Sequence, residues 1–216
     1  MNKPLPEYPA YALSERIADG TIHAIGTALA IAGAVLLIVA AAGEAPGERI
    51  AGVSVYAAAI VFSFAASGFY HMTPWERLRP ALRRIDHAAI YFKIAGTYTP
   101  LVVMIGSAFA YVVLAVVWAL AVVGAVAKLF FWNRPGKFAP ILYLALGWAS
   151  VMLLWPLAQT LPGPATGLVV IGGVLYSAGV IFFSWETLKY ANAIWHAFVL
   201  AASSCFFAAI AMGTFA

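Results

Sequence analysis

Charged residues are scarce in this chain, and their scarcity excludes most classes of protein. Only 9% of the 216 residues are Asp, Glu, Lys or Arg, whereas 64% are hydrophobic and the mean hydropathy is +0.95. Soluble domains contain about 25% charged residues, so an ordinary soluble enzyme or binding module is excluded. The single cysteine, Cys205, excludes a disulfide framework and a cysteine-based zinc motif. The net charge of +4 is therefore interpreted as membrane topology and gives no signal for nucleic-acid binding.

Long apolar runs dominate the sequence. A transmembrane helix needs about 20 mostly apolar residues. Because the runs are continuous and do not alternate with polar residues, they favour helices over a β-barrel. We predict an all-α fold: one seven-helix membrane domain over residues 1–216, with residues 1–20 as a polar segment before it, in a multi-pass cell-membrane protein. The predicted spans are Thr21–Ala42, Ile50–Tyr70, Asp86–Ile105, Ala108–Leu129, Ala139–Ala158, Gly167–Ser184 and Asn192–Phe215.

The placement of basic residues predicts the orientation. Ten of the twelve Lys and Arg residues lie before the first span, in the second, fourth and sixth connections, or, for Lys128, at the end of the fourth span beside the fourth connection. Arg49 alone lies in a connection on the other side, and Lys93 falls within the third span. Since cytoplasmic loops are enriched in Lys and Arg, we predict a cytoplasmic N-terminus and an external C-terminus.

Three metal-capable side chains are predicted to lie at one depth near the cytoplasmic face. His71 ends the second span, Asp86 begins the third and His196 lies in the first turns of the seventh. Ionisable residues in a membrane are costly and usually functional. Imidazole suits zinc, so we predict a shared zinc site, with Asp86 and Ser67 as groups that orient a reacting water or hold a ligand histidine.

Other polar residues near this face have less specific interpretations. His87 follows Asp86 by one position and so points about 100° away, which favours a packing role. His23 is a further candidate for the site, whereas Glu15 and Asp19 are expected to pair with the basic loops. Lys93 lies about 10 Å deeper than Asp86 on nearly the same helical face. It either snorkels or pairs with a buried carboxylate, or it meets an anionic lipid group or the product of a lipid hydrolysis inside the cavity.

Three segments resemble the haemolysin III family, the bacterial branch of the progestin and adipoQ receptor superfamily. They are SERIADGTIHAIGTAL, ASGFYHMTPWERLRPALRRIDHAAIYFKIAGTYTP and NAIWHAFVLAASSC. The resemblance implies seven helices with a cytoplasmic N-terminus, and zinc held by the histidine of a Ser-x3-His motif, here His71, and by a His-x3-His motif on the seventh helix. His196 is the second histidine of that motif, and Asn192 takes the place of the first. Phe206 stands where many bacterial relatives have another histidine.

Asn192 leaves the metal chemistry open. An amide oxygen is a weaker zinc donor than imidazole. One outcome is zinc binding through His71, His196, Asn192 and Asp86, with His23 or water completing the shell. The other outcome is weak or absent zinc binding.

Two functions fit these observations. The resemblance implies a zinc-dependent hydrolase of a lipid amide or ester, with Asp86 as proton acceptor. The alternative is a non-enzymatic protein of membrane homeostasis or lipid sensing. Direct pore formation is disfavoured because no amphipathic pore-forming segment is present. Membrane lipids are the expected partners, without nucleic acid, and the oligomeric state is not predicted.

Overall fold

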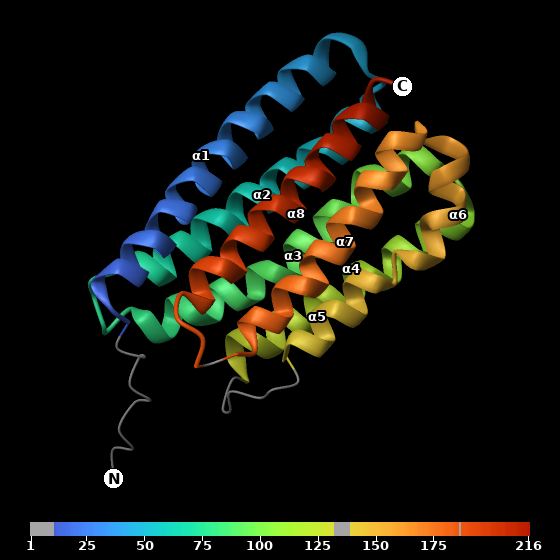
Figure 1. Cartoon of the computed structure of the whole chain (residues 1–216). Helices are drawn as coiled ribbons and strands as arrows, with labels where there is room; N and C mark the ends of the chain where they lie inside the picture. Colours follow the sequence, from blue (N-terminus) through green and yellow to red (C-terminus); the bar gives the residue numbers. More distant parts are fainter. Residues whose placement is uncertain (1–10, 132–138, 186) are drawn as a thin grey trace.

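Helices make up almost all of the chain in the computed structural model, which describes residues 11–131, 139–185 and 187–216 (Figure 1). No strand occurs within these ranges. The helices are α1 (Leu13–Glu44), α2 (Gly47–Met72), α3 (Arg79–Ile105), α4 (Ala108–Phe130), α5 (Ala139–Trp148), α6 (Val151–Thr160), α7 (Gly163–Phe183) and α8 (Ala191–Thr214).

Seven segments of the described chain are long and apolar enough to cross a membrane, which confirms the predicted fold class. Six of these segments are single helices, and α5 with α6 supplies the remaining one. The start of α1 and the end of α8 lie at opposite ends of the bundle, as an odd number of spans requires (Figure 1). Two helices begin well before the predicted spans, α1 at Leu13 and α3 at Arg79, whereas the other starts differ from the predicted ones by only a few residues. The first turns of α1 and α3 are polar, so hydropathy alone placed the starts of these spans too late.

The short link between the third and fourth spans is a true helix boundary. Gly106 ends α3 with a left-handed backbone, φ 67°, which glycine adopts without steric cost. Ser107 then begins α4, and its hydroxyl accepts a hydrogen bond from the Ala110 N–H at 3.2 Å. Two residues are therefore enough to reverse the chain direction.

The fifth span is broken between α5 and α6, and a tyrosine compensates for the break. The helix is interrupted at Ala149 and Ser150. The Tyr98 hydroxyl of α3 donates to the Leu146 and Gly147 carbonyl oxygens at 3.0 and 2.7 Å. Free carbonyls are costly away from water, so an irregular backbone is tolerated at membrane depth where protein groups satisfy it.

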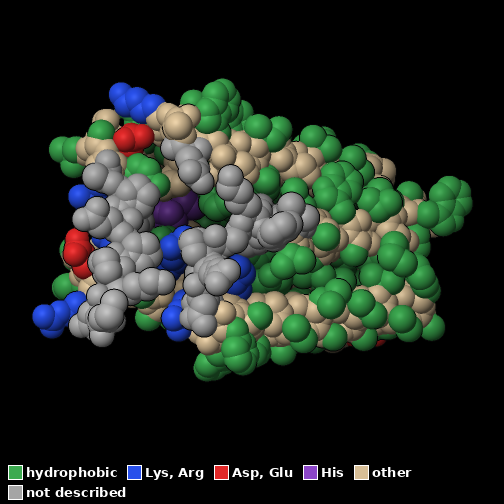
Figure 2. Space-filling view, turned by 90° about the horizontal axis from the view of Figure 1, so that it is seen from below, with side chains coloured by type: hydrophobic (Ala, Val, Ile, Leu, Met, Phe, Trp, Pro, Cys, Tyr) green, Lys and Arg blue, Asp and Glu red, His purple; other side chains and the backbone are tan. Residues whose placement is uncertain are grey.

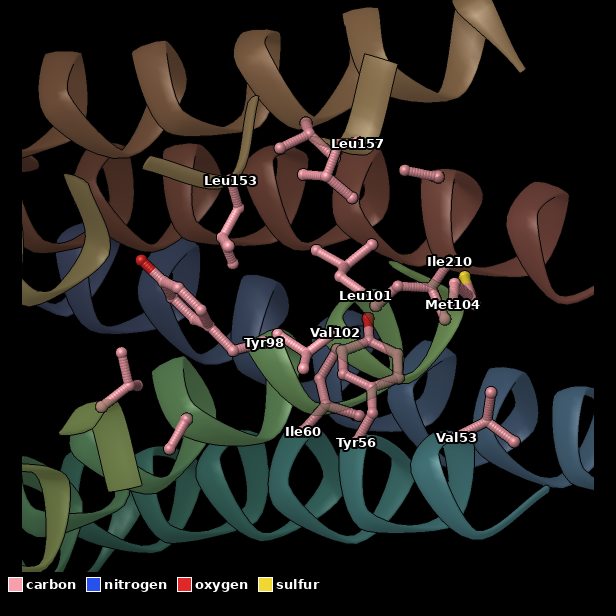
Figure 3. Close-up of a cluster of buried hydrophobic side chains, with 14 of the residues drawn as sticks. Val53, Tyr56, Ile60, Tyr98, Leu101, Val102, Met104, Leu153, Leu157 and Ile210 are labelled. Atoms are coloured by element: carbon pink, nitrogen blue, oxygen red, sulfur yellow. The ribbon is translucent and has the colours of Figure 1, made fainter. Parts of the chain in front are cut away.

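The bundle is held together by close helix contacts and a buried apolar cluster. Residues of α2, α3, α6 and α8 meet there, among them Tyr56, Val102, Leu157 and Ile210 (Figure 3). A Cβ added at Gly96 of α3 would clash with α2, so glycine permits this close approach.

A polar contact joins α2 to α8 at the end of the bundle where α2 begins and α8 ends. The Arg49 guanidinium of α2 donates to the Gly213 and Thr214 carbonyl oxygens of α8 at 3.3 and 3.0 Å. These carbonyls belong to the last turn of α8, where no intrahelical donor is available. Arg49 therefore joins α2 to α8 at the end opposite to the histidines.

Candidate metal centre

Four metal-capable side chains converge where α1, α2 and α8 meet. Asp19 and His23 come from α1, His71 from α2 and His196 from α8. One ligand atom from each residue lies within 4.8 Å of the corresponding atoms of the other three. Asp19 and His23 are four residues apart, so both lie on one face of α1. We call these four residues the His-Asp group.

Asp19 is the common partner of the three imidazoles. Its Oδ1 lies 2.6 Å from His196 Nδ1, a short hydrogen bond, and 3.6 Å from His23 Nε2. Its Oδ2 lies 3.3 Å from His71 Nδ1. Asp19, His23 and His196 are all buried, with 6%, 4% and 8% of their surface exposed. A buried carboxylate that faces three histidines requires compensating positive charge, either protons or a metal ion.

The imidazole rings crowd around this carboxylate. The His23 centroid lies 5.0 Å from that of His71 and 4.2 Å from that of His196, and the His71 and His196 centroids are 4.6 Å apart. Protonation of all three rings at these separations would place like charges together in a buried site. Neutral imidazoles are favoured for this reason, and neutral imidazole is the form that binds metals.

The donor set fits a metal ion. His23 Nε2 and His71 Nδ1 are buried and make no hydrogen bond with the part of the chain that the structure describes, although both face Asp19. Buried polar atoms without partners are rare and call for a missing ligand. Zinc–nitrogen bonds of about 2.0–2.1 Å in a tetrahedron place neighbouring donors about 3.3 Å apart. The Asp19 separations from His71 and His23 are close to this value.

The structure brings together some of the predicted site residues and adds others. His71 and His196 lie in one cluster, as expected, and the further candidate His23 joins them. Asp86 is not one of the four: it is buried elsewhere on α3, and its Oδ2 lies 3.8 Å from His87 Nδ1. It still faces the same cavity as the three imidazoles.

Asp19 was expected to pair with the basic loops, and the structure corrects this expectation. Its partners are His23, His71 and His196, because α1 turns this face inward. The spacing Asp19-x3-His23 was the available signal, since it matches those of Ser67 with His71 and of Asn192 with His196. Glu15 is a different case, because its carboxylate accepts the backbone N–H of Tyr190 at 2.8 Å and joins α1 to the segment before α8.

Ser67, Asn192 and Phe206 all line the cavity beside or beyond the His-Asp group. Asn192 lies one turn before His196 on α8 and forms a side-chain hydrogen bond with Tyr11, just outside the first span. Burial raises the pKa of the Tyr11 hydroxyl, and the Asn192 hydrogen bond acts against that rise. Asn192 is thus engaged at the rim of the site.

A cavity of about 1420 Å³ extends from the His-Asp group into the bundle. His23, His71, His196 and Asp86 line one end of it, whereas Asp19 does not line it. Leu101 on α3 also lines it, and at 1.5 Å per residue the wall from Asp86 to Leu101 is about 22 Å long. One leaflet of a bilayer contributes about 15 Å of hydrocarbon, so the cavity is long enough for an acyl chain.

Basic side chains surround the entrance to this end of the molecule. Figure 2 shows histidine in a recess at one end of this face, with Lys and Arg side chains and a few acidic ones near it, and mainly hydrophobic side chains toward the other end. Arg16, Arg79, Arg83 and Arg84 are among the residues that line the cavity. The distribution agrees with the end of the bundle predicted to face the cytoplasm.

Comparison with known proteins gives consistent matches. Residues 11–207 match the family model described as "Haemolysin-III related". The chain is 35% identical to Hemolysin-3 of Bacillus cereus over 196 residues, 90% of each chain. It is 34% identical to a Hemolysin-3 homolog of Bacillus subtilis over 91% of this chain and 93% of the relative. It is also 26% identical to human monocyte to macrophage differentiation factor, over 72% of this chain and 67% of the relative.

Proposed function

The chain belongs to the haemolysin III-related family of multi-span membrane proteins, and on that premise we propose that it is a metal-dependent hydrolase of a lipid amide or ester. The observation that carries the proposal is the position of the His-Asp group. Three imidazoles with metal-binding capacity line the end of a cavity that is long enough for an acyl chain. Zinc is the metal that we propose, because a set rich in imidazole suits it.

Each residue has a role that follows from its place. His23, His71 and His196 would hold the metal, with Asp19 behind them hydrogen-bonded to His196. A carboxylate in that position fixes the ring orientation and raises the basicity of its partner. The bound metal would supply Lewis acidity at the acyl carbonyl and lower the pKa of a nearby water.

Asp86 is the proposed proton acceptor. Its carboxylate is buried on the cavity wall and is not one of the His-Asp group, so it is available for proton transfer. It would take a proton from the attacking water and return it to the leaving amine or alcohol as the acyl bond breaks. The products are a carboxylic acid, ionised at neutral pH, and the free amine or alcohol. Ser67 lies on the same wall, one turn before His71, and is proposed to orient the water.

The test is turnover by the purified, zinc-loaded protein in lipid nanodiscs. An N-acyl sphingoid amide and a monoacyl ester are the probes, and the released fatty acid is measured by mass spectrometry. We expect release by the wild type, loss of both zinc and release in His196→Ala, and loss of release with zinc retained in Asp86→Asn. His87→Gln is the matched histidine control for zinc content, because His87 lies outside the His-Asp group.

No release of fatty acid from either probe by folded protein with one zinc per chain would refute the hydrolase. The non-enzymatic role in membrane homeostasis or lipid sensing would then be the better proposal. Measured coordination of the metal by all four residues of the His-Asp group would support that role, since structural zinc sites are closed whereas catalytic sites keep one position open. Retained turnover in Asp86→Asn would instead refute the assignment of Asp86 alone.

A further inference from the structure

Lys93 is a buried cation in the middle of the bundle. It belongs to α3, and only 7% of its surface is exposed. At 1.5 Å per residue it lies about 21 Å from the start of α3 at Arg79 and about 18 Å from the end at Ile105. Both distances exceed the reach of a lysine side chain, so Lys93 does not snorkel to either membrane surface.

The surroundings of the ammonium group are aromatic. Lys93 Nζ lies 5.0 Å from the centroid of the Tyr176 ring and 5.6 Å from that of the Phe64 ring. The Tyr176 hydroxyl is engaged with the Ser203 hydroxyl at 2.7 Å, which fixes this ring of α7 against α8. Rings hold a cation by their negative faces, but they accept no conventional hydrogen bond from its three N–H donors.

No carboxylate among the described residues pairs with Lys93. Among residues 11–131, 139–185 and 187–216, no Asp or Glu oxygen lies within 4.0 Å of its nitrogen. Asp86 belongs to the same helix but lies seven residues earlier, about 10 Å along the axis. A buried ammonium without an anionic partner is costly, and contacts with two rings offset only part of that cost.

Lys93 faces the cavity that His23, His71 and His196 also line. Its side chain lines the wall between Asp86 and Leu101. Beyond it, the lining includes Leu101, Leu153 and Val169, so a chain that extends from Lys93 in this direction meets apolar surface. The cavity thus combines one fixed positive charge with an apolar continuation.

From this arrangement we infer that Lys93 forms an anion-binding site for the carboxylate head of a single-chain amphiphile, separate from the His-Asp group. The carboxylate would accept hydrogen bonds from the ammonium, and the chain would lie along Leu101 and Leu153. One positive charge balances one carboxylate, whereas a phosphate monoester would leave excess negative charge buried. The site requires no turnover, so it stands or falls independently of the proposed hydrolysis.

The experiment compares probes that share one chain and differ in the head group. Hexadecanoate, hexadecyl phosphate and hexadecanol are titrated into the protein in detergent after removal of metal with a chelator, so that no metal competes for the head group. We expect hexadecanoate to bind at least about tenfold more tightly than hexadecanol, as a charge-assisted hydrogen bond requires. Equal affinities, or tighter binding of the phosphate, would overturn the inference without any variant.

Variants test whether Lys93 supplies the positive charge that binds the head group. Lys93→Met keeps an unbranched stem of similar size and should weaken hexadecanoate binding by about tenfold or more, with hexadecanol changed by less than about twofold. Lys189→Met is the matched control, because Lys189 also lies over a tyrosine ring, that of Tyr190 at 5.2 Å, but does not line the cavity. Unchanged hexadecanoate affinity in Lys93→Met, or binding that appears only in the zinc-loaded protein, would refute a lysine site.

Discussion

Replacement of Asp19 by asparagine tests the His-Asp group directly. The change keeps the shape of the side chain and removes its negative charge, while the amide can still accept a hydrogen bond from His196. In the structure, the Asp19 oxygens lie 2.6 to 3.6 Å from nitrogens of three imidazoles, so the lost charge belongs to the centre of the group. We expect a large loss of zinc affinity.

The expected loss of zinc affinity in Asp19→Asn lies between a lower and an upper estimate. A carboxylate that only orients a ligand histidine contributes about 10- to 100-fold to metal affinity. Two unit charges about 4 Å apart interact by about 4 kcal/mol at an effective dielectric constant of about 20, which corresponds to about 1,000-fold. Asp19→Asn should therefore weaken zinc binding by about 10- to 1,000-fold, measured by competition with a chromophoric chelator at constant pH in detergent.

Asp86→Asn is the matched control, and it discriminates between two ligand sets. The chemical change is the same and the burial is similar, with 8% of Asp86 exposed against 6% of Asp19. Because Asp86 lies outside the His-Asp group, its replacement should change zinc affinity by less than about tenfold. A greater loss in Asp86→Asn than in Asp19→Asn, with both variants folded, would refute our reasoning and restore the set predicted from the sequence.

Four further outcomes are expected. Asn192→His should change zinc affinity by less than about tenfold in a chelator titration, because His23, His71 and His196 already supply three imidazoles and Asn192 lies outside the His-Asp group, hydrogen-bonded to Tyr11. Zinc affinity should fall between pH 7.5 and pH 5.5, because protons compete for the imidazole nitrogens, and a flat profile would argue against imidazole ligands. Arg49→Ala should lower the melting temperature by about 3–6 °C through the loss of its hydrogen bonds to α8, with zinc affinity unchanged at the far end of the bundle. A reporter fused after Ala216 should be active only outside the cytoplasm, and cytoplasmic activity would contradict the predicted orientation.

Hydropathy was sufficient to predict the fold class, because a membrane span is defined mainly by the length of an apolar run. It was insufficient at helix ends, where polar residues continue the helix beyond the hydrocarbon. Asp19 lies in the second turn of α1, before the apolar run begins, so the sequence assigned this residue to a segment outside the bundle. The break between α5 and α6 was also missed, since the Tyr98 hydroxyl that stabilises it comes from α3, far away in the sequence.

The site was predicted only in part, because the depth of a residue in the membrane does not determine its position around the bundle. Alternating spans place the end of α2 and the starts of α3 and α8 on one side, which is why His71, Asp86 and His196 were grouped. Depth alone does not decide which helices are neighbours. In the structure α1 packs against both α2 and α8, so residues on the inner face of α1 meet His71 and His196.

The spacing of four residues indicates which helices are neighbours, whereas depth alone does not. Asp19 with His23, Ser67 with His71 and Asn192 with His196 each place two polar groups on one helical face at the same end of the bundle. A helix with a polar pair on one face in an apolar environment must turn that face away from lipid, since unpaired polar groups there are costly. Three such helices therefore pack together so that their polar groups pair with one another. Asp86 of α3 has no polar residue four positions before or after it, and α3 lines the cavity wall. Equal depth selected the candidate residues, and paired polar faces indicate which helices surround the His-Asp group.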